Sequence, residues 1–137
     1  MSEFLITNSC LCDSNKPFNQ CCEPLLTGSK VAKTAKQLMR SRYTAYALGG
    51  HGEYLIATWL PESTNGLSAA SLSEKEQDWL KLEILNSQQK GNIGRVEFNA
   101  YYKDENAGLN VLHEKSTFQR IGGRWYYVKG EVETIER

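Results

Sequence analysis

All four cysteines of this 137-residue chain lie within one stretch of thirteen residues, Cys10-Leu-Cys12-Asp-Ser-Asn-Lys-Pro-Phe-Asn-Gln-Cys21-Cys22. A closed structural zinc site takes four ligands at the corners of a tetrahedron, and these are commonly thiolates. Two close pairs joined by a short loop can supply all four ligands. We therefore predict a Zn²⁺ site formed by Cys10, Cys12, Cys21 and Cys22.

Disulfide bonds are the main alternative for these cysteines, since four cysteines allow three pairings. Disulfide bonds within a pair would close strained rings, whereas disulfide bonds between the two pairs are sterically possible. The first residues, Met1-Ser-Glu-Phe, carry no cationic stretch, and no apolar run of signal-peptide length follows. This pattern predicts a cytoplasmic protein, in which stable disulfides are rare. Cross-pair disulfides and free thiols remain the alternatives to zinc.

The cysteines belong to a longer pattern. It also keeps three other side chains at fixed spacings: Ser14, Lys16 and Phe18. The stretch resembles the SEC-C motif, a zinc-binding knuckle also found in the SecA translocation ATPase, whose usual form is Cys-Pro-Cys-Gly-Ser-Gly-Lys-x-Tyr/Phe-x-x-Cys-Cys. This chain has Leu11 for the proline, and Asp13 and Asn15 for the glycines. Asp and Asn tolerate left-handed backbone well, so the turn is expected to survive. Lys16 is a candidate donor to a thiolate sulfur.

Composition limits the class of protein. The chain has 16 basic and 16 acidic residues, and 40% of its residues are hydrophobic. Balanced charge gives no drive toward nucleic acid, and no apolar run approaches the length of a membrane span. We expect a soluble protein with one ordinary domain and a small appendage. The predicted boundaries are residues 1–28 for the zinc knuckle and residues 29–137 for an α+β domain.

Helical signals come first along the chain. Thr34 is a good N-cap for a helix over residues 35–48, whose apolar face repeats at helical spacing and which Gly49 ends. A shorter helix is expected over residues 52–59, followed by a loop over residues 62–70. Ser73 and the acidic residues after it predict a third helix that turns Trp79 and Leu80 inward.

Period-two alternation then predicts about four antiparallel strands. The first contains Leu82 and Ile84, the second covers residues 96–102, the third 109–120 and the last 125–129. Turns are expected at residues 104–108 and 122–123. Residues 1–9 are predicted to be extended, and residues 131–137 to be frayed or edge structure. Helices before strands indicate an α+β fold, with a curved sheet wrapped around the first long helix.

Several longer segments resemble the uncharacterised bacterial YchJ-type family. They are Leu38-Met-Arg-Ser-Arg-Tyr-Thr-Ala-Tyr46, Tyr54-Leu-x-x-Thr-Trp59, Leu112-His-Glu-x-Ser-x-Phe118 and Gly123-Arg-Trp-Tyr-Tyr. The resemblance implies a cystatin-like cone, as in nuclear transport factor two, in which the sheet curls over a helix and leaves a pocket. It also makes the exposed face of the sheet a candidate homodimer surface. It carries over no catalytic residues.

Five residues are candidates for the lining of that pocket: Arg40, Arg42, Tyr46, His113 and Glu114. Arg40 and Arg42 lie two apart on the long helix, so they point to different faces, and one of them could enter the cone beside Glu114. His113 and Glu114 are neighbours on a strand and face opposite sides of the sheet. The aromatic residues nearby are interpreted as core.

Two functions follow from these residues. The first is a binding module, in which the knuckle contacts a protein partner and the cone is a scaffold or holds a small ligand. A closed site of four thiolates favours it, because no coordination position is left for catalysis. The alternative is an enzyme that uses Glu114 or His113 as acid or base together with an arginine. Nucleic-acid binding is disfavoured by the neutral charge.

Overall fold

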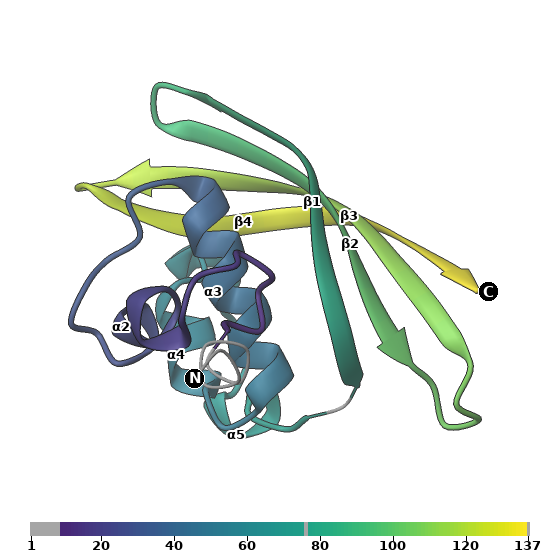
Figure 1. Ribbon diagram of the computed structural model, residues 1–137. Coiled ribbons are helices and arrows are strands. Elements are labelled where there is room, and N and C mark those ends of the chain that lie inside the picture. The colour runs from purple at the N-terminus through teal and green to yellow at the C-terminus, as the bar shows by residue number, and fades with distance from the viewer. Residues whose placement is uncertain (1–8, 76, 137) are drawn as a thin grey trace.

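The computed structural model describes residues 9–75 and 77–136 and confirms the α+β class. Short helices and one long helix, α3 (Ala35–Leu48), precede four antiparallel strands in the order β1-β2-β3-β4. Figure 1 shows the strongly curved sheet wrapping over α3, with the other helices on the same side of the sheet. This is the cone that the family resemblance implies. Of the predicted extended lead, residues 1–8 lie outside the described residues.

The cysteine-rich segment has little regular structure. Its elements are the single turn η1 (Phe18–Gln20) and the short helix α2 (Glu23–Leu26). Leu25 is 3% exposed, and Leu26 packs against the same core, so these two residues dock the knuckle on the cone. The predicted division at residue 28 stays a prediction.

Helix α3 begins where its cap predicts. The Thr34 hydroxyl accepts a hydrogen bond from the Gln37 backbone N–H at 3.0 Å, and Gly49 ends the helix in left-handed backbone. Ala35, Leu38 and Met39 are buried along the predicted apolar face. The polar residues Ser41, Arg42 and Thr44 are buried as well, because a different part of the molecule covers each side of this helix.

The second helix is shorter than predicted, and the third is in the wrong place. Helix α4 is Gly52–Ala57, and Pro61 opens the turn η2 (Pro61–Ser63) instead of ending a helix at Trp59. The next helix, α5 (Ala69–Leu72), begins within the last residues of the predicted loop, with Ser68 as its cap. Asp78 already starts a strand, and Leu80, predicted to face inward, is 47% exposed.

The four strands are β1 (Asp78–Lys90), β2 (Ile93–Lys103), β3 (Leu109–Ile121) and β4 (Arg124–Glu136). The predicted turns lie at residues 104–108 and 122–123, and both glycines of the second turn have positive φ. Strand β4 continues to Glu136 as an edge strand, which confirms the edge half of that prediction. A bulge between Thr117 and Phe118 shifts the register of β4 on β3.

The core lies between α3 and the concave face of the sheet. Val96, Phe98 and Ala100 alternate inward along β2, as predicted, and Phe118 on β3 is fully buried. Cys10, Cys12 and Cys22 belong to the same cluster of buried side chains, so the knuckle packs on the cone. Within the described residues, none of the helices has the length and apolarity needed to cross a membrane.

Candidate metal centre and cone cavity

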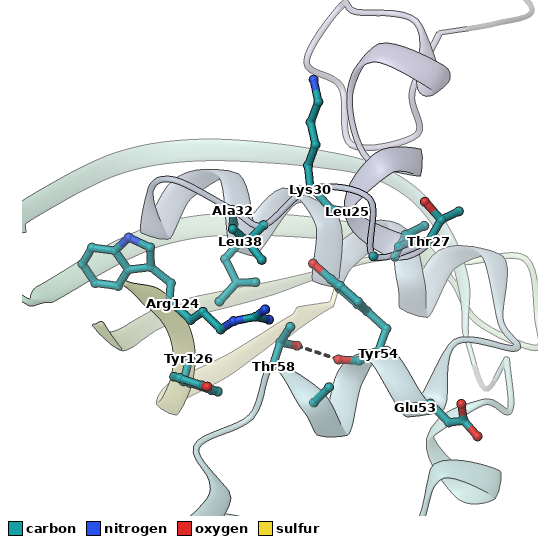
Figure 2. Close-up of a pocket in the computed structure, with 15 residues that line it drawn as sticks. Leu25, Thr27, Lys30, Ala32, Leu38, Glu53, Tyr54, Thr58, Arg124 and Tyr126 are labelled. Atoms are coloured by element: carbon teal, nitrogen blue, oxygen red, sulfur yellow. Dashed lines mark hydrogen bonds between the residues drawn. The ribbon is translucent and has the colours of Figure 1, made fainter. Parts of the chain in front are cut away.

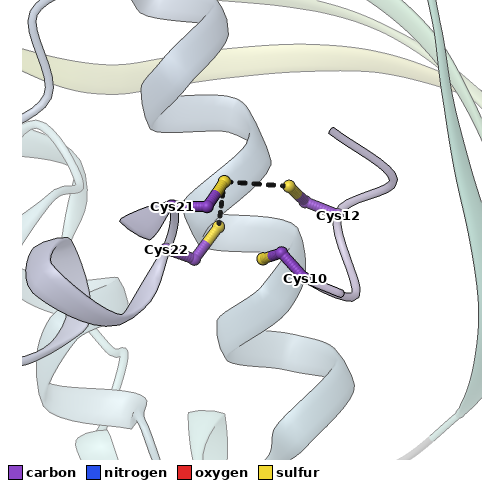
Figure 3. Close-up of side chains that lie close together, drawn as sticks. All are labelled: Cys10, Cys12, Cys21 and Cys22. Carbon is purple, nitrogen blue, oxygen red and sulfur yellow. Dashed lines mark hydrogen bonds between the residues drawn. The ribbon is translucent and has the colours of Figure 1, made fainter. Parts of the chain in front are cut away.

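The four cysteines converge from two segments beside α3 (Figure 3). Cys10 and Cys12 lie on a tight turn, closed by a hydrogen bond of 2.9 Å from the Cys10 backbone N–H to the Lys16 carbonyl. Cys21 and Cys22 lie between η1 and α2. The turn and the helical segment therefore present their thiols to one point.

The sulfur positions fit a tetrahedral metal ion. The four Sγ atoms all lie within 4.8 Å of one another, with 3.6 Å between Cys12 and Cys21 and 3.9 Å between Cys21 and Cys22. An ion with Zn–S bonds of about 2.3 Å separates its sulfurs by about 3.8 Å. All four cysteines are free, and three are buried. The cluster is compatible with metal binding.

The backbone of the turn explains two departures from the usual motif. Asp13 has φ of 63° and Asn15 has φ of 68°, so both occupy the left-handed region in which the motif has glycine. Asp and Asn enter this region more easily than other side chains. The replacements therefore leave the turn intact, as the sequence predicts.

Asp13 also contributes a contact that glycine could not make. Its carboxylate accepts a hydrogen bond of 2.8 Å from the Leu82 backbone N–H, which joins the knuckle to the edge strand β1. This contact crosses 69 positions of the sequence. It ties the metal-binding turn to the sheet.

We expect Asp13→Ala to lower the free energy of unfolding by about 1–2 kcal/mol, because it removes this charge-assisted bond and places alanine in left-handed backbone. Asp13→Asn keeps a hydrogen-bond acceptor and the preference for left-handed backbone. Its loss of unfolding free energy should therefore be less than about half that of Asp13→Ala. Urea denaturation measures both variants. Equal stabilities of the two would contradict the role of the hydrogen bond to Leu82.

Three side chains support the cysteines from outside. Ser14 Oγ lies 3.1 Å from Cys21 Sγ, Thr44 Oγ1 donates to Cys22 Sγ at 3.3 Å, and Arg40 Nη1 donates to the Cys12 carbonyl at 2.6 Å. Lys16, the predicted donor to a thiolate, is exposed and supplies its backbone carbonyl to the turn. Arg40 points to the knuckle and does not line the cone.

The thiols influence one another's charge. Hydrogen bonds from Cys10 and Cys22 lower the pKa of Cys12 to about 3, despite its burial. Hydrogen bonding of the Cys22 thiol to Cys10 and Cys12, together with burial, raises the pKa of Cys22. In the metal-free cluster the negative charge is therefore drawn to Cys12.

Thr44 offers a test of this support, because its hydroxyl is fully buried against the sulfurs. We expect Thr44→Val, which keeps the shape, to weaken metal retention about 10-fold, the lower end for loss of an outer-shell hydrogen bond. Thr44→Ser keeps the hydroxyl and should retain metal like the unaltered protein. Competition with a chromogenic chelator measures the affinity. Equal retention by both variants would contradict the role of the hydroxyl.

The cone contains a second site, a cavity of about 200 Å³. It brings together three of the predicted residues, Arg42, Tyr46 and Glu114, with apolar side chains of α3 and the sheet. His113 lies on the opposite face, where its Nε2 is 2.7 Å from Glu97 Oε2. His113 and Arg40 therefore do not reach this cavity.

Sequence reasoning missed three residues of this cavity region, Ser116, Tyr127 and Gly130. Ser116 Oγ donates to Glu114 Oε2 at 2.5 Å, and the Tyr127 hydroxyl donates to the same oxygen at 3.0 Å. A Cβ on Gly130 would clash with Glu114 Oε2, so a larger residue there would displace this carboxylate from its present position. Ser116 lies on the same face of β3 as Glu114, and this alternation was the signal that could have identified it. Tyr127 and Gly130 lie on β4, whose pairing with β3 could not be predicted from the local sequence.

A further cavity of about 300 Å³ lies at the seam between the knuckle and the cone. Figure 2 shows Lys30 and Thr27 on one side of it, with Tyr54 and Glu53 on α4 and Arg124 and Tyr126 on β4. Tyr54 is fixed by a hydrogen bond of 2.6 Å between its hydroxyl and Ser41 Oγ. No sequence pattern pointed to this cavity, because three distant segments form it.

These features define the class of protein. It has a cone of the nuclear transport factor two type and carries a SEC-C-like cysteine cluster. Residues 34–130 match the family model described as the middle NTF2-like domain of YchJ. The chain is 39% identical over 130 residues to the UPF0225 protein of Geobacter sulfurreducens, covering 91% of this chain and 80% of that protein. The chain therefore belongs to the YchJ family, also designated UPF0225.

Two further relatives agree with this assignment. The UPF0225 protein of Corynebacterium glutamicum is 36% identical over 127 residues, which cover 90% of this chain and 97% of that protein. The solution structure of a SEC-C motif containing protein from Rhodopseudomonas palustris superposes with a TM-score of 0.83 at 38% identity, and the match covers 90% of this chain and 97% of that one. The similarity therefore spans both the knuckle and the cone.

Proposed function

We propose that this protein is a zinc-stabilised binding module, in which Zn²⁺ is bound by Cys10, Cys12, Cys21 and Cys22 and the cone cavity takes a small ligand. The observation that carries the proposal is the convergence of four free thiols within 4.8 Å against α3. Four thiolates close the coordination sphere of zinc, so the metal has a structural role. The Rhodopseudomonas palustris relative is a SEC-C motif containing protein, which supports the same interpretation.

In this proposal zinc supplies the cross-link between the turn and α2, which have too small a core to fold alone. Ser14 and Thr44 donate hydrogen bonds to sulfurs, and Arg40 fixes the carbonyl of Cys12. Helix α3 carries Thr44 and Arg40 to the metal site and Arg42 to the cavity. Zinc would thus stabilise the helix that lines the ligand site. A reduced thiolate site also suits the cytoplasmic location that we propose.

Metal analysis of protein purified reduced and without chelator tests the metal assignment. We expect about one zinc per chain, with thiols that react only after chelation or denaturation. Four thiols that titrate freely in metal-free folded protein would overturn the proposal. Stoichiometric iron or copper in the analysis would overturn the assignment of zinc and identify that metal as the resident ion.

Two partner surfaces stay predictions. A protein partner of the knuckle would meet Leu11, which is 47% exposed between two of the cysteines. A homodimer through the sheet would bury a polar outer face that includes the His113–Glu97 pair. Sedimentation at several salt concentrations measures that association, and a monomer throughout would exclude it.

For the enzymatic alternative, the remaining candidates are Glu114 as acid or base and Arg42 as its partner. His113 faces the other side of the sheet, so it cannot act in the same cavity. The geometry of Glu114 and Arg42 serves binding as well as proton transfer. We favour binding, because the carboxylate already accepts two hydrogen bonds from the protein.

A further inference from the structure

The cone cavity contains a cation whose position is fixed by the protein. Arg42 is 3% exposed, and its Nη1 donates to the Leu55 carbonyl and to Thr58 Oγ1, both at 2.7 Å. Its Cζ lies 4.9 Å from the centre of the Trp59 ring and 4.8 Å from that of Tyr127. These contacts hold the guanidinium rigidly between two aromatic side chains.

The same guanidinium keeps donors for a ligand. In the described part of the chain, its hydrogen bonds to the protein all use Nη1, and no carboxylate oxygen lies within 4.0 Å of it. Every buried side-chain nitrogen or oxygen among these residues has a hydrogen-bond partner. The remaining N–H groups of Arg42 therefore face accessible space, which is the cavity that this residue lines.

Glu114 supplies the opposite charge to the same cavity. Its Oε2 is fixed by Ser116 and Tyr127, while Oε1 makes no hydrogen bond to any described residue. Tyr127 contacts both charged groups, Arg42 over its ring and Glu114 at its hydroxyl. Arg42 and Glu114 therefore both line the cavity, and both contact Tyr127.

The other walls are apolar and mostly aromatic. Tyr43, Trp79 and Phe98 line the cavity, and Trp79 packs edge to face against Tyr43 with ring centres 6.1 Å apart. Small-ligand sites typically combine such walls with a few fixed polar groups. The volume of about 200 Å³ suits a ligand with one ring.

Charge decides which polar group such a ligand carries. A carboxylate would be attracted to Arg42 but repelled by Glu114, and an amidinium would meet the reverse. A neutral carboxamide accepts from Arg42 and donates to Glu114, and it enters an apolar cavity without the cost of desolvating an ion. We infer that the cavity binds a small aromatic carboxamide, an inference that rests on the proposed small-ligand function of the cone.

Three molecules of the same shape test this inference with the full, zinc-loaded chain. Benzamide, benzoate and benzamidine differ only in the charge and hydrogen bonding of one group. Protein-observed NMR titration yields their dissociation constants and places the shifted signals. We expect benzamide to bind at least about 10-fold more tightly than either ion, because only benzamide satisfies both fixed groups. Equal or tighter binding of either ion would overturn the inference.

Glu114→Gln adds a readout that a purely structural role would not move. The variant leaves Arg42 uncompensated, so the preference should shift toward benzoate by about 10-fold or more. Glu97→Gln, the same change on the opposite face of the sheet, is the matched control and should keep the preference for benzamide. An unchanged preference in folded Glu114→Gln would also overturn the inference.

Failure of this inference differs from failure of the proposed function. Binding of a different fragment in the cavity, without preference for the carboxamide, would remove the ligand class and leave the binding module. No binding by a chemically broad fragment set would remove the ligand-binding function itself. Metal analysis tests the zinc site separately from both.

Discussion

Cys12→Ser is expected to lose its zinc and to unfold at a much lower temperature than the unaltered protein. Serine is a poor zinc ligand, and three remaining thiolates no longer close the site. Loss of a structural metal can cost about 4 kcal/mol or more. For a chain of this size the melting midpoint should fall by about 10–20 °C. Scanning calorimetry with metal analysis of the same samples measures both effects.

Leu11→Ser is the matched control for this prediction. It makes an apolar-to-polar change one residue away, at a side chain that is 47% exposed and is not a candidate ligand. Its zinc content should be unchanged and its midpoint should move by less than about 2 °C. Chelation of the unaltered protein under reducing conditions should reproduce the Cys12→Ser midpoint, and added zinc should reverse it. Equal midpoints for Cys12→Ser and Leu11→Ser would contradict a structural metal.

Local chemistry explains why the knuckle and the first long helix could be predicted. The cysteine spacing, the left-handed Asp13 and Asn15, and the Thr34 cap each depend on residues a few positions apart. Such short-range features are written directly in the sequence. The alternation along β2 was equally readable, because one face of that strand is buried.

The prediction of a third helix after Ser73 was wrong because strand pairing in the sheet outweighed a local helix signal. Ser73 and the acidic residues after it imitate a helix start, but Trp79 pairs with Tyr102 across the sheet, with ring centres 5.2 Å apart. A register shift between Trp79 and Lys81 interrupts the alternation that would have revealed the strand. Ser68 then caps α5 instead.

The cone cavity shows the same limit at the level of single side chains. Helical spacing separates Arg40 from Arg42, but it does not say which arginine enters the cone. That choice depends on the Leu55 carbonyl and Thr58, which accept from Arg42, and on the Cys12 carbonyl, which accepts from Arg40. These partners lie 13 to 28 positions away along the chain. Only the folded chain brings them together.

Phe118→Ala is expected to destabilise the cone by about 3–5 kcal/mol, because it empties a fully buried ring site in a well-packed core. Phe118 is 0% exposed, lies opposite Gly94 and Tyr127 in the sheet, and packs edge to face on Tyr127 with ring centres 5.7 Å apart. The midpoint should fall by about 10–20 °C. Phe118→Leu keeps most of the volume and should cost under about 1.5 kcal/mol.

Metal content separates this variant from Cys12→Ser, although both lower the midpoint by a similar amount. Within the described residues, Phe118 makes no hydrogen bond or ring contact with the knuckle, so folded Phe118→Ala should retain about one zinc per chain. Loss of zinc by folded Phe118→Ala would mean that the metal site depends on packing in the centre of the sheet. Retention of zinc would assign the stability of the metal site to the turn, α2 and the adjoining face of α3, where Thr44 and Arg40 contact the cysteine segment.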